Sequence, residues 1–78
     1  MSFDDLLPVL NRVFSEHGNF NENTTWQDVE EWDSIGHLNL IVELEDVFNV
    51  NFSEEEIEGI KSVREIVTAI QNHMNENR

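Results

Sequence analysis

The sequence predicts an all-α fold, a small four-helix bundle with a long loop between the first and second helices and a short third helix. Apolar residues recur at intervals of three and four in three segments, which is the spacing of helices that bury one face. Strand-like alternation of apolar and polar residues is absent. Two Ser-x-x-Glu sequences, each typical of a helix start, lie nine residues apart, so the helix between them has to be short.

The first helix is expected to begin at Asp4 or Asp5, because Pro8 then lies in the first turn, where its missing N–H removes no bond within the helix. Four residues with helical spacing form its apolar face: Leu6, Leu10, Val13 and Phe14. Gly18 suits a left-handed backbone position that ends the helix.

Residues 19–33 form a long polar connection, of the kind that either carries function or contains a short helix. Phe20 and Trp26 are expected to anchor this loop by packing into the core. His17, before the loop, and His73, near the end of the chain, are isolated in the sequence, and we expect both to be solvated.

The second helix is predicted from about Ser34 to Phe48. Apolar residues occupy more than half of its circumference, which indicates a central helix packed by neighbours on several sides. Its open side is expected to consist of Gly36, Asn39, Glu43 and Asp46, with Ile35, Leu38 and Val42 near the edge.

The third and fourth helices are predicted from the two capping boxes. Ser53 pairs with Glu56 in the first and Ser62 with Glu65 in the second. In such a box the serine hydroxyl and the glutamate carboxylate each accept a backbone N–H that the helix leaves unbonded. The last helix is expected to run from Val63 through Ile66, Val67 and Ile70 to Met74.

The chain is strongly acidic. Its 78 residues, expected to form one domain over 1–78, contain four Lys and Arg against seventeen Asp and Glu, a formal net charge of −13. No basic residue lies between Arg12 and Lys61. Such a charge repels nucleic acid and attracts basic protein surfaces, although acid can also serve solubility alone. Without cysteine, a secretory signal or an apolar run of membrane-spanning length, we expect a cytoplasmic protein, and a monomer.

The sequence predicts neither a catalytic site nor a metal site. His37 lies one turn after Ser34, but a serine nucleophile also needs a group that orients the histidine and an oxyanion hole, and so short a chain shows neither. A calcium loop needs oxygen ligands at positions one, three and five and glycine at six, and starting at Asp28 or Asn49 does not give this pattern.

Ser34 follows Asp33 at the start of the second helix. Backbone N–H groups at a helix start are unbonded and, together with the helix dipole, favour a negative charge, so a phosphodiester on the Ser34 oxygen would be stabilised there. The alternative is that Ser34 is only a helix cap.

The block of residues 31–38, Glu-Trp-Asp-Ser-Ile-Gly-His-Leu, resembles the Asp-Ser-Leu attachment motif of acyl carrier proteins. Residues 44–48, 53–57 and 60–63 resemble later landmarks of that family in order and spacing. The resemblance implies a non-catalytic carrier whose Ser34 bears 4′-phosphopantetheine, and whose arm carries acyl groups as thioesters between enzymes. It also implies that Asp33 helps a phosphopantetheinyl transferase to recognise the site, while Trp32 either plugs the core or flanks the arm.

The resemblance places partner binding on the second helix, against the transferase and basic-surfaced acyl-transferring or synthase enzymes. The residues expected to make this contact are Ile35, Leu38, Asn39, Val42, Glu45 and Asp46. Gly36 and Asn39 stand where fatty-acid carriers usually have acids, and Ile35 replaces their leucine. These departures favour a specialised acyl, polyketide or surface-sugar pathway over a housekeeping role. Two alternatives stay open, an aminoacyl cargo and an unmodified acidic helical module that only binds a partner.

Overall fold

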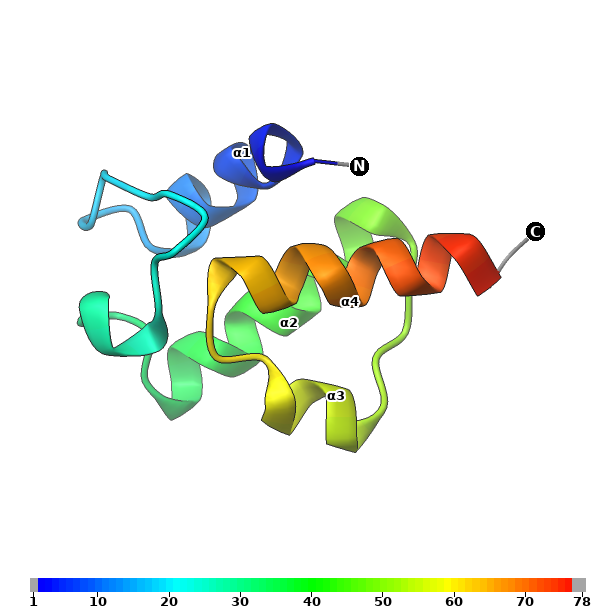
Figure 1. Cartoon of the computed structure of the whole chain (residues 1–78). Coiled ribbons are helices and arrows are strands. Elements are labelled where there is room, and N and C mark those ends of the chain that lie inside the picture. The colour runs from blue at the N-terminus through cyan, green and yellow to red at the C-terminus, as the bar shows by residue number, and fades with distance from the viewer. Residues whose placement is uncertain (1, 77–78) are drawn as a thin grey trace.

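The computed structural model describes residues 2–76 and confirms the predicted all-α fold of four helices (Figure 1). The helices are α1 (Phe3–Val13), α2 (Ser34–Phe48), α3 (Glu54–Gly59) and α4 (Val63–Glu76), with a short 3₁₀-helix, η1 (Trp26–Asp28), in the long loop. α1 packs against both α2 and α4. In Figure 1, α2 and α4 run from left to right and α1 runs in the opposite direction, so α2 and α4 begin on the side where α1 ends.

The core is formed by one face of each long helix. Its fully buried side chains on the helices include Leu6 and Leu10 of α1, Leu40 and Leu44 of α2, and Val63, Ile66 and Ile70 of α4. Phe14, just after α1, is also fully buried and stacks on Trp32, with ring centroids 5.5 Å apart. Trp32 itself is 3% exposed and therefore belongs to the core.

α1 begins at Phe3, earlier than the predicted Asp4 or Asp5. The backbone N–H of Ser2 donates to Asp5 Oδ2 at 3.0 Å, and this contact closes a first turn ahead of the predicted one. Pro8 therefore lies inside the helix rather than in its first turn. Gly18 has the expected positive φ of 72°, but α1 has already ended at Val13, so this glycine turns the following loop rather than ending the helix.

The predicted capping box at α3 is confirmed, whereas only the serine half of the predicted box at α4 forms, because Glu65 Oε1 accepts the N–H of Lys61 rather than that of Ser62. Ser53 N–H donates to Glu56 Oε1 at 2.9 Å, and Glu56 N–H donates to Ser53 Oγ at 3.2 Å. Glu65 N–H likewise donates to Ser62 Oγ at 3.2 Å. Because α4 already starts at Val63, α3 is short, as predicted. α4 extends two residues beyond its predicted end, to Glu76.

The long loop is held by backbone bonds to the connection between α3 and α4. Trp26 N–H donates to the carbonyl oxygen of Lys61 at 2.9 Å, and Val63 N–H donates to that of Thr24, also at 2.9 Å. The prediction that the Trp26 ring anchors the loop is wrong, because 46% of this residue is exposed and its backbone makes the attachment. Phe20 is half-buried and packs against the core, as predicted.

The two histidines expected to be solvated are both half-buried. The ring of His17 lies 4.8 Å from that of Phe20. His73 Nε2 lies 2.8 Å from Glu56 Oε2, and the His73 ring meets Phe52 edge-on at 5.3 Å. Their burial follows from contacts between residues distant in the sequence, which a local pattern does not contain.

The prediction that α2 is packed on several sides is also wrong. Only Leu40, Ile41 and Leu44 of this helix are buried, because α1 packs against one face and the six-residue α3 is too short to cover the rest. Gly36, expected on the open side, is half-buried: a Cβ there would overlap the carbonyl oxygen of Glu31 and lie 3.2 Å from the Phe14 ring.

Candidate functional site

The Ser34 hydroxyl, in the first turn of α2, does not cap the helix. Asp33 is the N-cap, and its Oδ1 accepts the N–H of Gly36 at 2.8 Å. Ser34 is the first helical residue; it is exposed, and its hydroxyl forms no hydrogen bond with another residue in 2–76. The alternative in which Ser34 serves as the helix cap is therefore wrong.

The preceding loop fixes the position of this turn. Because a side chain at Gly36 would overlap Glu31, the loop backbone approaches α2 more closely than any other residue type would allow. The N–H of His37 donates to the Asp33 carbonyl oxygen at 2.8 Å and starts the helical ladder. The N–H groups of Ser34 and Ile35 come before this bond and so have no helical partner, which leaves a partial positive charge beside the hydroxyl.

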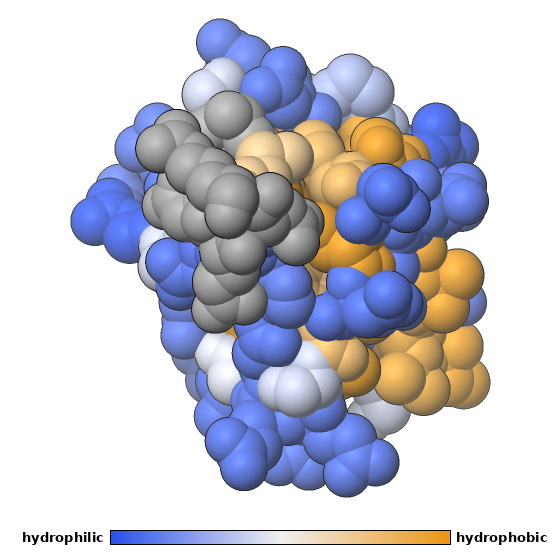
Figure 2. All heavy atoms as spheres, turned by 90° about the vertical axis from the view of Figure 1, so that its right-hand side faces the viewer, coloured by the Kyte–Doolittle hydropathy of each residue, from blue (hydrophilic) through white to orange (hydrophobic). Residues whose placement is uncertain are grey.

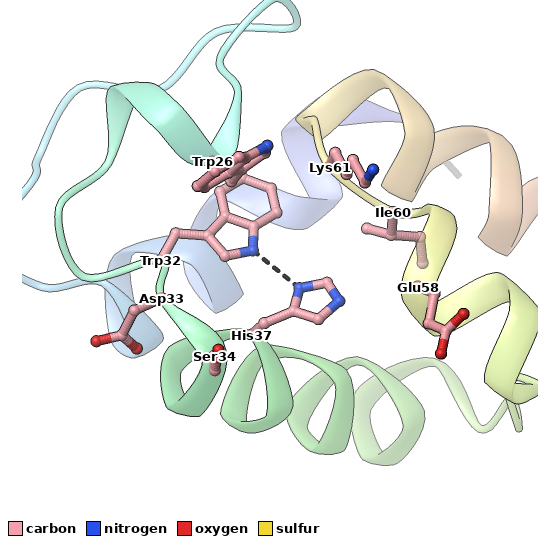
Figure 3. A pocket seen from close by; sticks show the side chains of 8 residues that line it. All are labelled: Trp26, Trp32, Asp33, Ser34, His37, Glu58, Ile60 and Lys61. Atoms are coloured by element: carbon pink, nitrogen blue, oxygen red, sulfur yellow. Dashed lines mark hydrogen bonds between the residues drawn. The ribbon is translucent and has the colours of Figure 1, made fainter.

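A hollow of about 380 Å³ opens next to Ser34 (Figure 3). Its lining residues are Trp26, Trp32, Asp33, Ser34, His37, Glu58, Ile60 and Lys61. In Figure 3, His37 projects from α2 between Trp32 on one wall and Ile60 and Glu58 on the other, and Ser34 lies close by at the start of the helix. Indole, imidazole and isoleucine side chains make the hollow mainly apolar, with Lys61 and Glu58 as its charged groups beside Asp33.

The wall opposite Ser34 was not predicted. Glu58, Ile60 and Lys61 come from the end of α3 and the connection to α4, and Trp26 comes from the long loop. The backbone bonds from Trp26 to Lys61 and from Val63 to Thr24 bring these segments together, and no local sequence pattern predicts that pairing. The one available signal was Lys61, the sole Lys or Arg between Arg12 and Arg64.

Five of the six predicted partner-binding residues are exposed on α2. Ile35, Leu38 and Val42 are 72%, 58% and 63% exposed and, at spacings of three and four, form an apolar stripe along the helix. Asn39 and Asp46 are also exposed. Figure 2 shows apolar side chains gathered along one side of a mostly polar face.

Two carboxylates of α2 are engaged within the molecule. Glu45, the sixth predicted contact, is half-buried, and its Oε2 accepts the N–H of Phe52 at 2.9 Å. Glu43 pairs with Arg12 of α1, with 2.6 Å between Glu43 Oε2 and the guanidinium nitrogen. Arg12 therefore balances the charge of Glu43, whereas Glu45 keeps its charge but is held by the chain that follows the helix.

The residues around Ser34 suit a phosphate-linked arm. An exposed, unbonded hydroxyl next to unpaired N–H groups can carry a phosphodiester, and the adjoining apolar hollow can receive part of a flexible chain. Within residues 2–76, no three His, Asp or Glu side chains come together as metal ligands. The same residues include no helix with the length and apolar character needed to cross a bilayer.

Comparison with known proteins agrees with this chemistry. The model of the phosphopantetheine attachment site family matches residues 5–70. The solution NMR structure of holo acyl carrier protein from Geobacter metallireducens is similar, with a TM-score of 0.86 and 28% sequence identity. The match covers 96% of this chain and 87% of that one. The search of curated proteins finds no match. Since the family model covers most of the sequence, this chain belongs to the phosphopantetheine-binding acyl carrier protein family.

Proposed function

We propose that Ser34 is the attachment residue and that the chain carries acyl intermediates of a specialised biosynthetic pathway. As a carrier the protein is not an enzyme, and the arm, when attached, supplies the thiol on which acyl groups are held as thioesters. The observation that carries the assignment is the exposed Ser34 hydroxyl at the start of α2, which forms no hydrogen bond with another residue of 2–76 and adjoins the hollow.

Ser34 and Asp33 have separate tasks in the loading step. Ser34 Oγ loses its proton to solvent and forms a bond to phosphorus, while the phosphoanhydride bond of coenzyme A breaks and the nucleotide bisphosphate leaves. The N–H groups of the first turn of α2 then stabilise the charge of the phosphodiester. Asp33 caps the helix and, in this proposal, also presents its carboxylate to the transferase.

The family implies a phosphopantetheinyl transferase and acyl-handling enzymes as partners. We propose that they dock on Ile35, Leu38, Asn39, Val42 and Asp46. Glu43 and Glu45 are engaged within the molecule, so the apolar side chains of α2 are expected to make the main contact. These side chains would enter an apolar depression on the partner, and basic groups around that depression would face the acidic residues nearby. Glu45 contributes charge rather than contact. The net charge of −13 favours approach by basic enzymes and disfavours nucleic acid.

Two sequence departures support a specialised pathway, fatty-acid-like, polyketide or surface-sugar. Asn39 is exposed and uncharged, and Ile35 is the most exposed large apolar residue of α2. Gly36 carries less weight, because its close approach to Glu31 explains the absence of a side chain. The proposal includes a single carrier domain over 1–78, acting as a monomer in the cytoplasm, with an aminoacyl cargo as the alternative.

Mass spectrometry tests the attachment residue. Apo protein incubated with coenzyme A and a broad-specificity phosphopantetheinyl transferase should gain the mass of one phosphopantetheine. Ser34→Ala should gain none, whereas Ser53→Ala, which removes a hydroxyl at another helix start, should be loaded fully. Loading of Ser34→Ala would contradict Ser34 as the attachment residue. No loading of the native chain by several transferases would contradict the carrier proposal and favour an unmodified module.

A further inference from the structure

His37 is bonded through both ring nitrogens to two different parts of the molecule. The indole N–H of Trp32 donates to His37 Nδ1 at 2.9 Å, as the dashed line in Figure 3 shows. His37 Nε2 lies 2.7 Å from the carbonyl oxygen of Ile57 in α3. The imidazole also stacks on the indole, with centroids 6.3 Å apart and 18° between the planes. This ring therefore joins the loop before α2 to α3 across the hollow beside Ser34.

The partners determine the tautomer of His37. A carbonyl oxygen only accepts, so Nε2 carries a proton, and an indole nitrogen only donates, so Nδ1 has a free lone pair. Both bonds exist together only in the neutral ring protonated at Nε2. A second proton, on Nδ1, would leave the bond to Ile57 intact. It would place the Nδ1–H donor against the indole N–H donor of Trp32, and the bond between them would be lost.

Each bond satisfies a group that lacks its usual partner, which is water for the Trp32 indole and a further helical turn for the Ile57 carbonyl. Trp32 is 3% exposed, so its indole N–H has little access to water. The Ile57 carbonyl belongs to the last turn of α3, and Lys61 N–H, which would reach it in a longer helix, donates to Glu65 Oε1 instead. His37 thus holds Trp32 and the end of α3 at a fixed separation.

Three charged groups line the hollow together with His37. Asp33 comes from the start of α2, Glu58 from α3, and Lys61 from the connection to α4. The hydrogen bonds of the imidazole go to Trp32 and Ile57 rather than to these groups, and a protonated ring would in addition face their charges across the hollow.

We propose that His37 is a positioning residue: as the neutral Nε2–H tautomer it fixes the walls of the hollow, and so determines whether the arm on Ser34 can lie between Trp26 and Ile60. This inference rests on the proposed attachment at Ser34. Protonation of His37 releases Trp32, alters the hollow and frees the arm into solvent.

NMR of the apo protein tests whether neutral His37 bridges Trp32 and Ile57, independently of the arm. The ring-nitrogen shifts of His37 should report the Nε2–H tautomer at neutral pH, and the Trp32 indole resonance should move when acid protonates the ring. His37→Gln offers an acceptor and a donor and should keep the Trp32 resonance near its native position while abolishing the pH response. His73→Gln, the matched control, should keep that response. An Nδ1–H tautomer, or a Trp32 response that persists in His37→Gln, would show that His37 does not bridge Trp32 and Ile57 in the proposed way.

The holo protein tests the consequence. After mass spectrometry has established loading, nuclear Overhauser contacts between the gem-dimethyl group of the arm and the Trp26 ring should appear in the native protein and in His37→Gln at neutral pH. They should be lost in His37→Ala and in the native protein at acid pH. Contacts unchanged by either perturbation would overturn the inference while leaving the attachment intact. Absence of loading would instead overturn the proposed function. The apo experiment would still show whether His37 bridges Trp32 and Ile57.

Discussion

The starts of α2 and α3 use a serine in opposite ways. At α3, Ser53 is the N-cap, and its hydroxyl accepts the N–H of Glu56 at 3.2 Å. At α2, the N-cap is Asp33, and Ser34 stands one residue further on with an unbonded hydroxyl. The difference shows how a helix start can present a hydroxyl: at α2 the neighbouring Asp33 takes the structural role, and Ser34 is available for the attachment proposed above.

Gly36→Ala should have the largest effect on this comparison. The new methyl group would overlap the Glu31 carbonyl oxygen, a backbone atom that cannot move without the loop, so we expect a loss of about 2–3 kcal/mol in the free energy of unfolding. Denaturant unfolding measures it. Gly59→Ala is the matched control, because a Cβ at that position would meet no heavy atom within 4 Å and its φ is not in the left-handed range. Equal stability of the two variants would contradict the close approach at α2.

Removal of either cap should cost less. Asp33→Ala and Ser53→Ala each delete an acceptor for a first-turn N–H, and each should lower the free energy of unfolding by about 1 kcal/mol. Asp33→Asn should be nearly neutral because asparagine caps as well as aspartate. If Asp33→Asn nevertheless slows loading by the transferase, the carboxylate is recognised for its charge; if its loading rate equals that of the native protein, Asp33 is a cap alone.

The comparison also shows what a sequence can predict. Ser53 and Glu56 are three residues apart and bond to each other, so their arrangement follows from local geometry. The start of α2 at Ser34 was predicted from the same kind of local signal and is confirmed. The resemblance to acyl carriers then supplied a function that local geometry alone does not.

The hollow could not be predicted because its walls meet only in the folded chain. Trp26 reaches Lys61 through a backbone bond, and the exposure of its ring reverses the expectation that a tryptophan in a loop fills the core. His37 was considered only as a partner for Ser34, whereas its ring is bonded to Trp32 and to Ile57. Such contacts depend on tertiary packing, which spacing along the sequence does not encode.

The pH dependence of unfolding tests the contribution of Glu56 to the capping box at the start of α3. The Ser53 N–H donates to Glu56 and lowers the pKa of that carboxyl below its ordinary value of 4.5; burial opposes this shift, and His73 supports it. A lowered folded-state pKa means that the stabilisation is present above 4.5 and is lost as the pH falls through the folded value. Glu56→Gln keeps the cap without the charge, so native protein should exceed it by about 0.5 kcal/mol at neutral pH, with the difference vanishing in acid. A difference that is independent of pH would contradict a role for the charge.

Ser34→Ala should have the smallest effect on stability, although under the proposed function it should abolish loading. The hydroxyl makes no hydrogen bond within residues 2–76, and alanine is the better helix former, so we expect a change within about 0.5 kcal/mol and towards higher stability. Thermal and denaturant unfolding of the apo protein, beside Ser53→Ala, measure the contrast between a hydroxyl used for chemistry and one used for capping. A loss at Ser34 as large as that at Ser53 would mean that this hydroxyl supports the fold, and the distinction between the two helix starts would fail.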